Sequence, residues 1–365
     1  MDKYERERYE KRRQRLKRKR QKEMMRLIVC LFLIVALSVI LILLITRRSH
    51  KIFSQEETNY LMQPDRQLSL VLPRTVSSSE VKDKLQTIYD MELASRFKVG
   101  GVYVTDETGK VLYEENAHAK LYPASTTKLM TTILALEYTK DLDAPVTIGS
   151  LYGCYDDPDS MLLWLEEGDQ MSMRDMLYAL LTESYNDVAC AIAIEIAGSI
   201  ESFADLMNQK AKELGMNDTH FANPHGLFDA EHYTSPYDLN LLIRKAASYD
   251  LFRELESTKE ATIKIISQGQ ENEIYIENTS FFLNGDYSVP GLTFIGGKTG
   301  YVEQSHSNYA SCFTDGTHNY YVSVLHSADG PYMTALILDY LLVPDAMSDL
   351  LEIDPYLALW YDLEF

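Results

Sequence analysis

A serine and a lysine stand three residues apart in an order that suits a nucleophile and its base. Ser125 and Lys128 lie in the run Pro123-Ala-Ser-Thr-Thr-Lys128, and residues 125–138 carry the apolar pattern of a helix. Side chains three apart share a helix face, so the two groups can meet. A serine nucleophile needs a base, and a lysine serves when burial or a second cation lowers its pKa. The pair therefore makes Ser125 a candidate nucleophile with Lys128 as its base.

This spacing is common by chance, because Ser79/Lys82 and Ser95/Lys98 match it as well. A second pattern, Ser184-Tyr185-Asn186, lies in a helix-rich stretch. Its serine offers a hydroxyl that can relay a proton, and its asparagine offers an amide that can orient a peptide. Alone, the pattern is better explained by a helix cap or a turn, since serine and asparagine favour both.

A third pattern is Lys298-Thr299-Gly300, which follows two further glycines. Glycines allow a ligand or another backbone to approach closely. A fixed ammonium group beside a hydroxyl suits a substrate carboxylate. If Lys298 lies near Lys128, its charge also helps to keep Lys128 neutral.

In this order the three patterns are the signature of penicillin-binding proteins and class A β-lactamases. Residues 111–345 resemble the D-alanyl-D-alanine carboxypeptidase family of low-molecular-mass penicillin-binding proteins. The resemblance rests on the three patterns and on neighbouring stretches, which are 122–131, Glu167-Gly168-Asp169, 221–227 and 297–301. It implies an α+β fold of the β-lactamase and transpeptidase type, with an antiparallel sheet flanked by helices.

The resemblance also implies roles for individual residues. Ser125 attacks the carbonyl between two D-alanines of a peptidoglycan peptide, Lys128 takes its proton, and Ser184 helps to pass that proton to the leaving amine. The substrate-binding residues expected from the motifs are Asn186, Lys298, Thr299, Gly300 and Tyr301. Backbone N–H groups of Ser125 and Tyr301 would form the oxyanion hole, β-lactams would inhibit, and no metal or cofactor is expected.

Two departures from the family pattern keep another class of function open. Tyr185 stands where glycine is usual, and 301–306 replaces a run rich in alanine and glycine. A non-catalytic muropeptide-binding or scaffold protein on the same fold is therefore an alternative. A β-lactamase is a further alternative, which needs a Glu-x-x-x-Asn stretch to position a deacylating water. Within residues 184–298 this spacing occurs at Glu213 and Asn217.

The charge of the chain is unevenly distributed. The formal net charge is −19, yet residues 1–26 carry thirteen Lys/Arg and five Asp/Glu. The remaining chain is strongly acidic, which argues against nucleic acid as a partner, because phosphates bind to a basic face.

An apolar run follows the basic segment and predicts a membrane anchor. Residues 27–46 contain roughly 19 apolar positions, which span about 28 Å as a helix, the thickness of a bilayer core. The basic side predicts a cytoplasmic N-terminus in a bacterial cell membrane. A cleaved signal peptide fits less well, since the run is long and Thr46-Arg47-Arg48 follows it. We expect a tether at 47–77, an extracytoplasmic catalytic domain at 78–345 and an extension at 346–365.

The pattern of elements predicts one antiparallel sheet backed by helices, because strands lie at both ends with helices between them. Hairpins are expected at 100–115 and 309–325 and further strands at 262–266 and 274–276. The expected helices are 79–93, 125–138, two within 173–197, 202–214, 239–247 and 332–342. Cys154, Cys190 and Cys312 show no disulfide spacing and are expected to be buried thiols.

Overall fold

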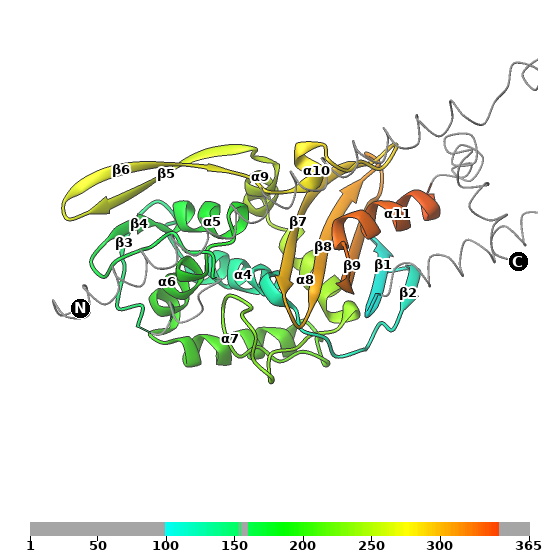
Figure 1. Ribbon diagram of the computed structural model, residues 1–365, viewed down its shortest axis with the longest axis horizontal. Coiled ribbons are helices and arrows are strands. Elements are labelled where there is room, and N and C mark those ends of the chain that lie inside the picture. The colour runs from blue at the N-terminus through cyan, green and yellow to red at the C-terminus, as the bar shows by residue number, and fades with distance from the viewer. Residues whose placement is uncertain (1–98, 153, 155–159, 343–365) are drawn as a thin grey trace, which may run out of the picture. The chain divides into compact units, whose positions relative to one another are not determined.

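The computed structural model describes residues 99–152, 154 and 160–342, and all of them fall in one compact unit, Asp83–Phe365 (Figure 1). The predicted basic tail, membrane span, tether, helix 79–93 and C-terminal extension lie outside these residues. Among the helices of the described part, none is long and apolar enough to cross a membrane. The domain boundaries and the anchor therefore remain predictions.

A five-stranded antiparallel sheet in the order β2-β1-β9-β8-β7 joins the two ends of the described chain (Figure 1). Both predicted hairpins are confirmed, and the turns Asp106–Gly109 and Asp315–Thr317 lie between their strands. The strands are β1 (Gly101–Asp106), β2 (Val111–Glu115), β7 (Thr293–Val302), β8 (His306–Thr314) and β9 (Asn319–Ser327).

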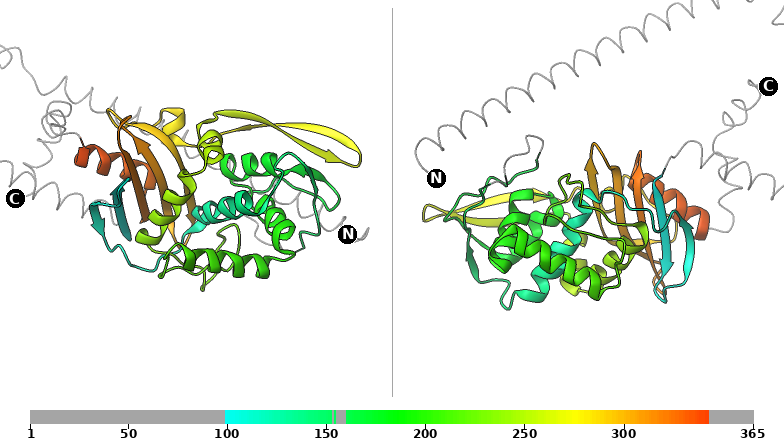
Figure 2. Two further views of the ribbon diagram at one scale, coloured as in Figure 1. Left: turned by 180° about the vertical axis from the view of Figure 1, so that it is seen from behind. Right: turned by 90° about the horizontal axis from the view of Figure 1, so that it is seen from below.

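Helices cover both faces of this sheet, because successive strand residues point to opposite sides. Val102 and Val324 belong to an apolar cluster with Ile337 of α11 (Gly330–Leu342). On the other face, the amide of Asn240 in α8 (Pro236–Ala247) donates to the carbonyls of Tyr103 and Tyr321. The two views in Figure 2 show α8 and α11 on opposite sides of the sheet.

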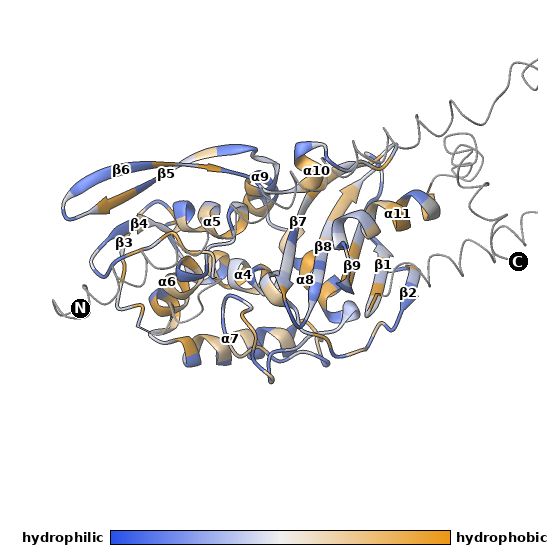
Figure 3. Ribbon diagram, viewed as in Figure 1, coloured by the Kyte–Doolittle hydropathy of each residue, from blue (hydrophilic) through white to orange (hydrophobic). Residues whose placement is uncertain are grey.

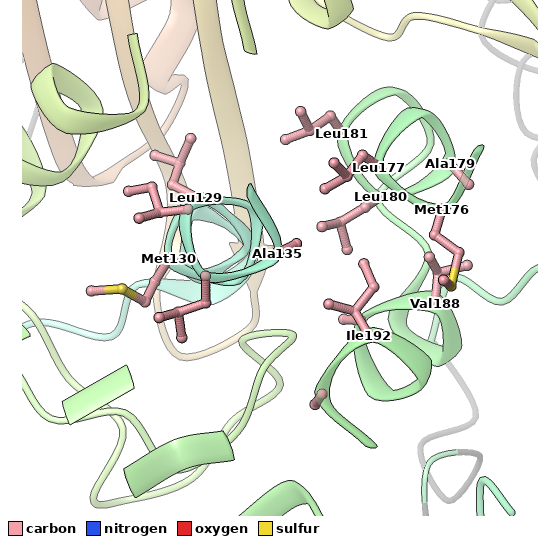
Figure 4. Packing of buried hydrophobic residues seen from close by; sticks show 14 of the residues in the cluster. Leu129, Met130, Ala135, Met176, Leu177, Ala179, Leu180, Leu181, Val188 and Ile192 are labelled. Atoms are coloured by element: carbon pink, nitrogen blue, oxygen red, sulfur yellow. The ribbon is translucent and has the colours of Figure 1, made fainter. Parts of the chain in front are cut away.

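The main core lies between the sheet and a group of helices that surround α4. The 3-10 turn η1 (Ala124–Thr127) runs directly into α4 (Lys128–Tyr138), whose first eight residues are all buried. Figure 4 shows Leu180 and Ile192 in the space between α4 and its neighbours. The other helices are α5 (Met173–Thr182), α6 (Asn186–Ala197), α7 (Ile200–Glu213), α9 (Asp250–Ser257) and α10 (Phe281–Asn284).

The expectation of a single sheet is wrong, because a second sheet in the order β3-β4-β5-β6 packs beside α5. Its strands are β3 (Pro145–Thr147), β4 (Gln170–Ser172), β5 (Glu260–Ser267) and β6 (Gln270–Glu277). The first two are three residues long, too short for alternation to reveal them. Figure 3 shows the hydrophilic character of β6, whose residues are largely exposed.

The three cysteines of the described residues are free and buried, as the sequence predicts.

Candidate active site

The sequence predicts that Ser125 lies within an α-helix at 125–138. In the structure, Ser125 lies in the 3-10 turn η1, and the α-helix begins at Lys128. Ala124 has a positive φ of 50°, a conformation that few non-glycine residues adopt. The turn is fixed by Thr126, whose hydroxyl donates to the carbonyl of Pro123 at 2.8 Å. Ser125 is partly exposed while its neighbours are buried, so the local backbone presents one hydroxyl to the surface.

Two glycines hold the nucleophile turn from either side. A Cβ on Gly226, whose φ is +89°, would lie 1.9 Å from the carbonyl oxygen of Ala124. A Cβ on Gly300 of β7 would lie 2.8 Å from the carbonyl oxygen of Pro123 and 2.9 Å from the nitrogen of Ser125. Side chains at these positions would displace the turn, so glycine is needed for close approach.

Three oxygen atoms surround the side-chain nitrogen of Lys128. Its Nζ lies 3.0 Å from Oγ of Ser125, 2.6 Å from Oδ1 of Asn186 and 2.8 Å from the carbonyl oxygen of His225. The predicted meeting of Ser125 and Lys128 is therefore present. The two carbonyl oxygens can only accept hydrogen bonds, whereas the serine hydroxyl can also donate.

Burial holds the pKa of Lys128 well below its usual range, and the charge of Lys298 lowers it further. The expected influence of one lysine on the other is thus present in the predicted direction. A neutral amine has two N–H bonds and one lone pair. In the neutral form, donation to Asn186 and His225 would use both N–H bonds and leave the lone pair for the hydroxyl of Ser125, which lies 3.0 Å from Nζ.

Asn186 begins α6, and both ends of its amide group are held. Nδ2 donates to Oγ of Ser160 at 2.7 Å, which turns Oδ1 toward Lys128. The next residue, Asp187, accepts backbone N–H bonds from residues 163–165 and so fixes the segment that follows Ser160. The pattern Ser184-Tyr185-Asn186 therefore contributes one direct contact to the base.

Ser184 lies in the loop between α5 and α6 with a positive φ of 60°. Its Oγ is buried and has no hydrogen-bond partner within the described part of the chain. It contacts neither Lys128 nor Lys298 by a hydrogen bond. A buried hydroxyl without a partner is unusual and calls for an explanation such as a catalytic role or a bound water.

Lys298-Thr299-Gly300 lies within strand β7. Lys298 is 3% exposed and its Nζ donates to the carbonyl oxygen of Thr299 at 3.3 Å. Burial lowers the pKa of this lysine as well. Thr299 is partly exposed, and Tyr301 is 68% exposed at the end of the strand. The strand thus places a cation next to the nucleophile turn.

Several groups that shape the site are absent from the sequence-based set. The carbonyl of His225 contacts the base, and the buried ring of His232 lies 2.7 Å from the hydroxyl of Thr127. Burial lowers the pKa of His232 to about 3, so this ring is neutral and can donate from Nε2. Ser160 and Glu256 belong to none of the sequence patterns described above. Only the stretch 221–227, already part of the family resemblance, signalled that this segment shapes the site.

These contacts bring Ser125, the buried Lys128 and Asn186 together at one site on an α+β fold. Residues 98–328 match the peptidase S11 family of D-alanyl-D-alanine carboxypeptidases, and the match covers more than half of the chain. The chain belongs to this family.

Relatives and solved structures agree with this assignment. The chain is 33% identical to the D-alanyl-D-alanine carboxypeptidase DacF of Bacillus subtilis over 217 residues, which is 59% of this chain and 53% of the relative. It is also 33% identical to DacD of Escherichia coli, over 61% of this chain and 56% of the relative. The chain thus spans about half the length of the curated relatives it matches. The Streptomyces K15 DD-transpeptidase superposes with a TM-score of 0.60 at 28% identity, over 67% of this chain and 97% of that structure.

Proposed function

We propose that the chain is a serine-type D-alanyl-D-alanine carboxypeptidase that removes the last D-alanine from peptidoglycan stem peptides through an acyl-enzyme on Ser125. One observation carries the proposal: Nζ of the buried Lys128 lies 3.0 Å from Oγ of Ser125 and also contacts two carbonyl oxygens, those of Asn186 and His225. This arrangement provides the base that a serine nucleophile needs. Family membership and the relatives' names support the choice of substrate.

In the proposed acylation step, Oγ of Ser125 bonds to the carbonyl carbon between the two D-alanines while its proton passes to Nζ of Lys128. The tetrahedral intermediate then expels the terminal D-alanine, whose amine takes up a proton through the hydroxyl of Ser184. Asn186 and Thr299 orient the peptide, and the Lys298 ammonium group holds the terminal carboxylate. The backbone N–H groups of Ser125 and Tyr301 stabilise the oxyanion, and each such donor is typically worth about 3 kcal/mol of barrier.

Water completes the reaction by attack on the acyl carbonyl, which frees the shortened peptide and returns the proton to Ser125. A β-lactam carries an acylating carbonyl and a carboxylate, so the same groups bind it. It leaves a stable acyl-enzyme when water attacks slowly. Penicillin is therefore a probe for the nucleophile.

The departures at Tyr185 and 301–306 support a second candidate, a muropeptide-binding scaffold that does not turn over. Tyr185 is partly buried and packs against the core at the edge of the site, where glycine would leave more room. This candidate shares the fold and the peptide ligand with the enzyme. It differs in that Ser125 forms no covalent bond.

We also propose that residues 27–46 anchor the catalytic domain to the bacterial cell membrane, with residues 1–26 in the cytoplasm. The support is the length of the apolar run and the basic residues before it. Fractionation of cells that produce the full chain and a chain without 27–46 tests this. Equal recovery of both chains in the membrane fraction would contradict the anchor.

The deciding experiment labels the purified full chain with fluorescent penicillin, beside Ser125→Ala, and then measures release of D-alanine from a stem peptide. Label on the wild-type chain alone, together with D-alanine release, is the expected result. Absence of label on both with intact peptide binding favours the scaffold. Rapid loss of label with hydrolysis of the drug would indicate a β-lactamase.

A further inference from the structure

A buried carboxyl group that the proposed mechanism does not use lies against the strand of the Lys-Thr-Gly motif. Glu256, in the last turn of α9, is 1% exposed. Its Oε2 accepts a hydrogen bond from the N–H of Gly297 at 3.3 Å, whereas its Oε1 is buried and has no hydrogen-bond partner in the described residues. Burial of an incompletely bonded carboxylate is unfavourable and favours its neutral form unless a nearby cation offsets the cost.

Strand β7 places this carboxyl group and the nucleophile on either side of one lysine. Gly296, Lys298 and Gly300 share a face, because side chains alternate along a strand. A Cβ on Gly296 would lie 2.9 Å from Cβ of Glu256, and a Cβ on Gly300 would lie 2.9 Å from the nitrogen of Ser125. Each step of two residues spans about 7 Å. Lys298 therefore projects between Glu256 and Ser125.

The balance of charges around Lys298 depends on this carboxyl group. Burial lowers the pKa of Lys298, whereas the charge of Glu256 raises it. Burial in turn raises the pKa of Glu256, and Lys298 lowers it. Lys128 of α4 is close enough to Lys298 for the charge of Lys298 to lower its pKa further, after burial. On β8, burial raises the pKa of Tyr309, and the charge of Glu256 raises it further.

The remaining charged groups on the packed helices are engaged elsewhere. On α9, Arg253 bonds to the carbonyl of Ala247 and to Asp250, and Glu254 is exposed. On α8, Arg244 bonds to the carbonyl of Asp106 and Lys245 pairs with Glu137, while Asp238 binds Thr219. Among the described residues, Glu256 is thus the acidic group that acts on Lys298.

We propose that Glu256 is a positioning residue that keeps the Lys298 ammonium group charged and available on the Ser125 side of β7. The inference rests on the proposed acyl transfer, in which Lys298 must hold a carboxylate while Lys128 stays neutral. Without a nearby negative charge, burial would favour neutral Lys298. Glu256 therefore makes two neighbouring buried lysines differ in charge.

The test compares the wild-type full chain with Glu256→Gln and with Glu254→Gln, the same change at an exposed position of the same helix. The rate constant for acylation by penicillin is measured between about pH 6 and pH 10. This range extends from below neutral pH to near the ordinary pKa of a lysine side chain. The glutamine side chain can still accept from Gly297, so only the charge is removed. The alkaline limb is the part of the pH profile in which the acylation rate falls as pH rises. In Glu256→Gln we expect this limb to move down by about one pH unit, which is a roughly tenfold loss of rate above the limb. The limb of Glu254→Gln should match the wild type.

The outcomes separate this inference from the proposed function. A wild-type chain that penicillin does not acylate refutes the acyl-transfer function itself. An acylated wild type with the same alkaline limb in Glu256→Gln overturns the role of Glu256. If Glu256→Gln does not fold, Glu256→Asp withdraws the charge by one methylene group and should also lower the limb; an unshifted limb there overturns the role as well. If the alkaline limb of the wild-type chain already lies below about pH 7, the proposed role of Glu256 is overturned without any variant.

Discussion

Gly300 of β7 lies so close to the nucleophile that a Cβ there would stand 2.9 Å from the backbone nitrogen of Ser125. The strand that supplies Lys298 and the turn that supplies Ser125 are therefore in backbone contact. Their spacing, and with it the proposed oxyanion hole between Ser125 and Tyr301, depends on the absence of a side chain at this position. This relationship gives a direct test of the site geometry.

Gly300→Ala is expected to push β7 away from the nucleophile turn and to slow acylation by penicillin about a hundredfold, because small displacements of reacting groups have effects of this size. Stopped-flow or quenched-flow acylation measures the loss. Gly149→Ala is the matched control, since its Cβ would meet Ile194 at an ordinary 3.5 Å. Full acylation in Gly300→Ala would show that the strand is not part of the site.

Asp187→Asn should destabilise the segment that follows Ser160. The buried carboxylate accepts backbone N–H bonds from residues 163–165 and from Val188. An amide offers one accepting oxygen and places an NH2 group against N–H donors. We expect a loss of about 3 kcal/mol, which lowers the melting temperature by about 6–12 °C in a domain of this size.

Differential scanning calorimetry checks this effect, with Asp205→Asn on an exposed position of α7 as the control. The control should stay within about 0.5 kcal/mol of the wild type. Equal melting temperatures for Asp187→Asn and the wild type would mean that these hydrogen bonds contribute little.

Local patterns in the sequence predicted the parts of the site whose partners are close along the chain. Ser125 and Lys128 are three residues apart, and the 3-10 turn that leads into α4 brings them together as the spacing predicted. The hairpins at 100–115 and 309–325 were equally accessible, since turn residues separate alternating strands. The α+β class follows from these elements.

Contacts between distant segments could not be predicted in the same way. The carbonyl of His225 lies almost a hundred residues from Lys128, and any residue type could supply a carbonyl. Glu256 reads as an ordinary charged residue on a short helix, and only the packing of α9 on β7 shows that it is buried. The second sheet was missed because β3 and β4 are too short to carry a pattern.

A neutral Lys128 has a consequence for stability that is independent of activity. Burial lowers the pKa of this lysine in the folded chain, whereas in the unfolded chain it returns to about 10.4. Between these two values the unfolded chain binds one more proton, so the stability contributed at this position rises with pH. Relative to Lys128→Met, the wild type should gain about 1.4 kcal/mol per pH unit in this window.

Urea unfolding of both chains at about pH 7.5 and pH 9 measures the difference in stability. Both pH values lie below the pKa of a lysine in the unfolded chain, so Lys128 is charged there when the chain is unfolded. The expected change is about 2 kcal/mol in favour of the wild type at the higher pH. Parallel stabilities at both values would indicate that Lys128 carries a charge in the folded protein, which would remove the base from the proposed mechanism.

Asn186→Asp places a negative charge beside Lys128 and leaves the shape of the side chain at position 186 nearly unchanged. Nζ of Lys128 lies 2.6 Å from Oδ1 of Asn186, so the variant places a carboxylate in direct contact with the amine. An opposite charge at this distance raises the pKa of a lysine by about 1–3 units. The base is then protonated at neutral pH, and we expect acylation by penicillin to fall by about ten- to a thousandfold there.

The loss should be reversed as pH rises, because Lys128 regains its lone pair once the pH passes the new pKa. The acidic limb of the acylation profile therefore moves to higher pH, while the melting temperature is not lowered by the new ion pair. Asn272→Asp, the same substitution on the exposed strand β6, is the control and should leave the limb in place. A uniform loss at every pH would mean that Asn186 acts on the substrate alone and does not influence the charge of Lys128.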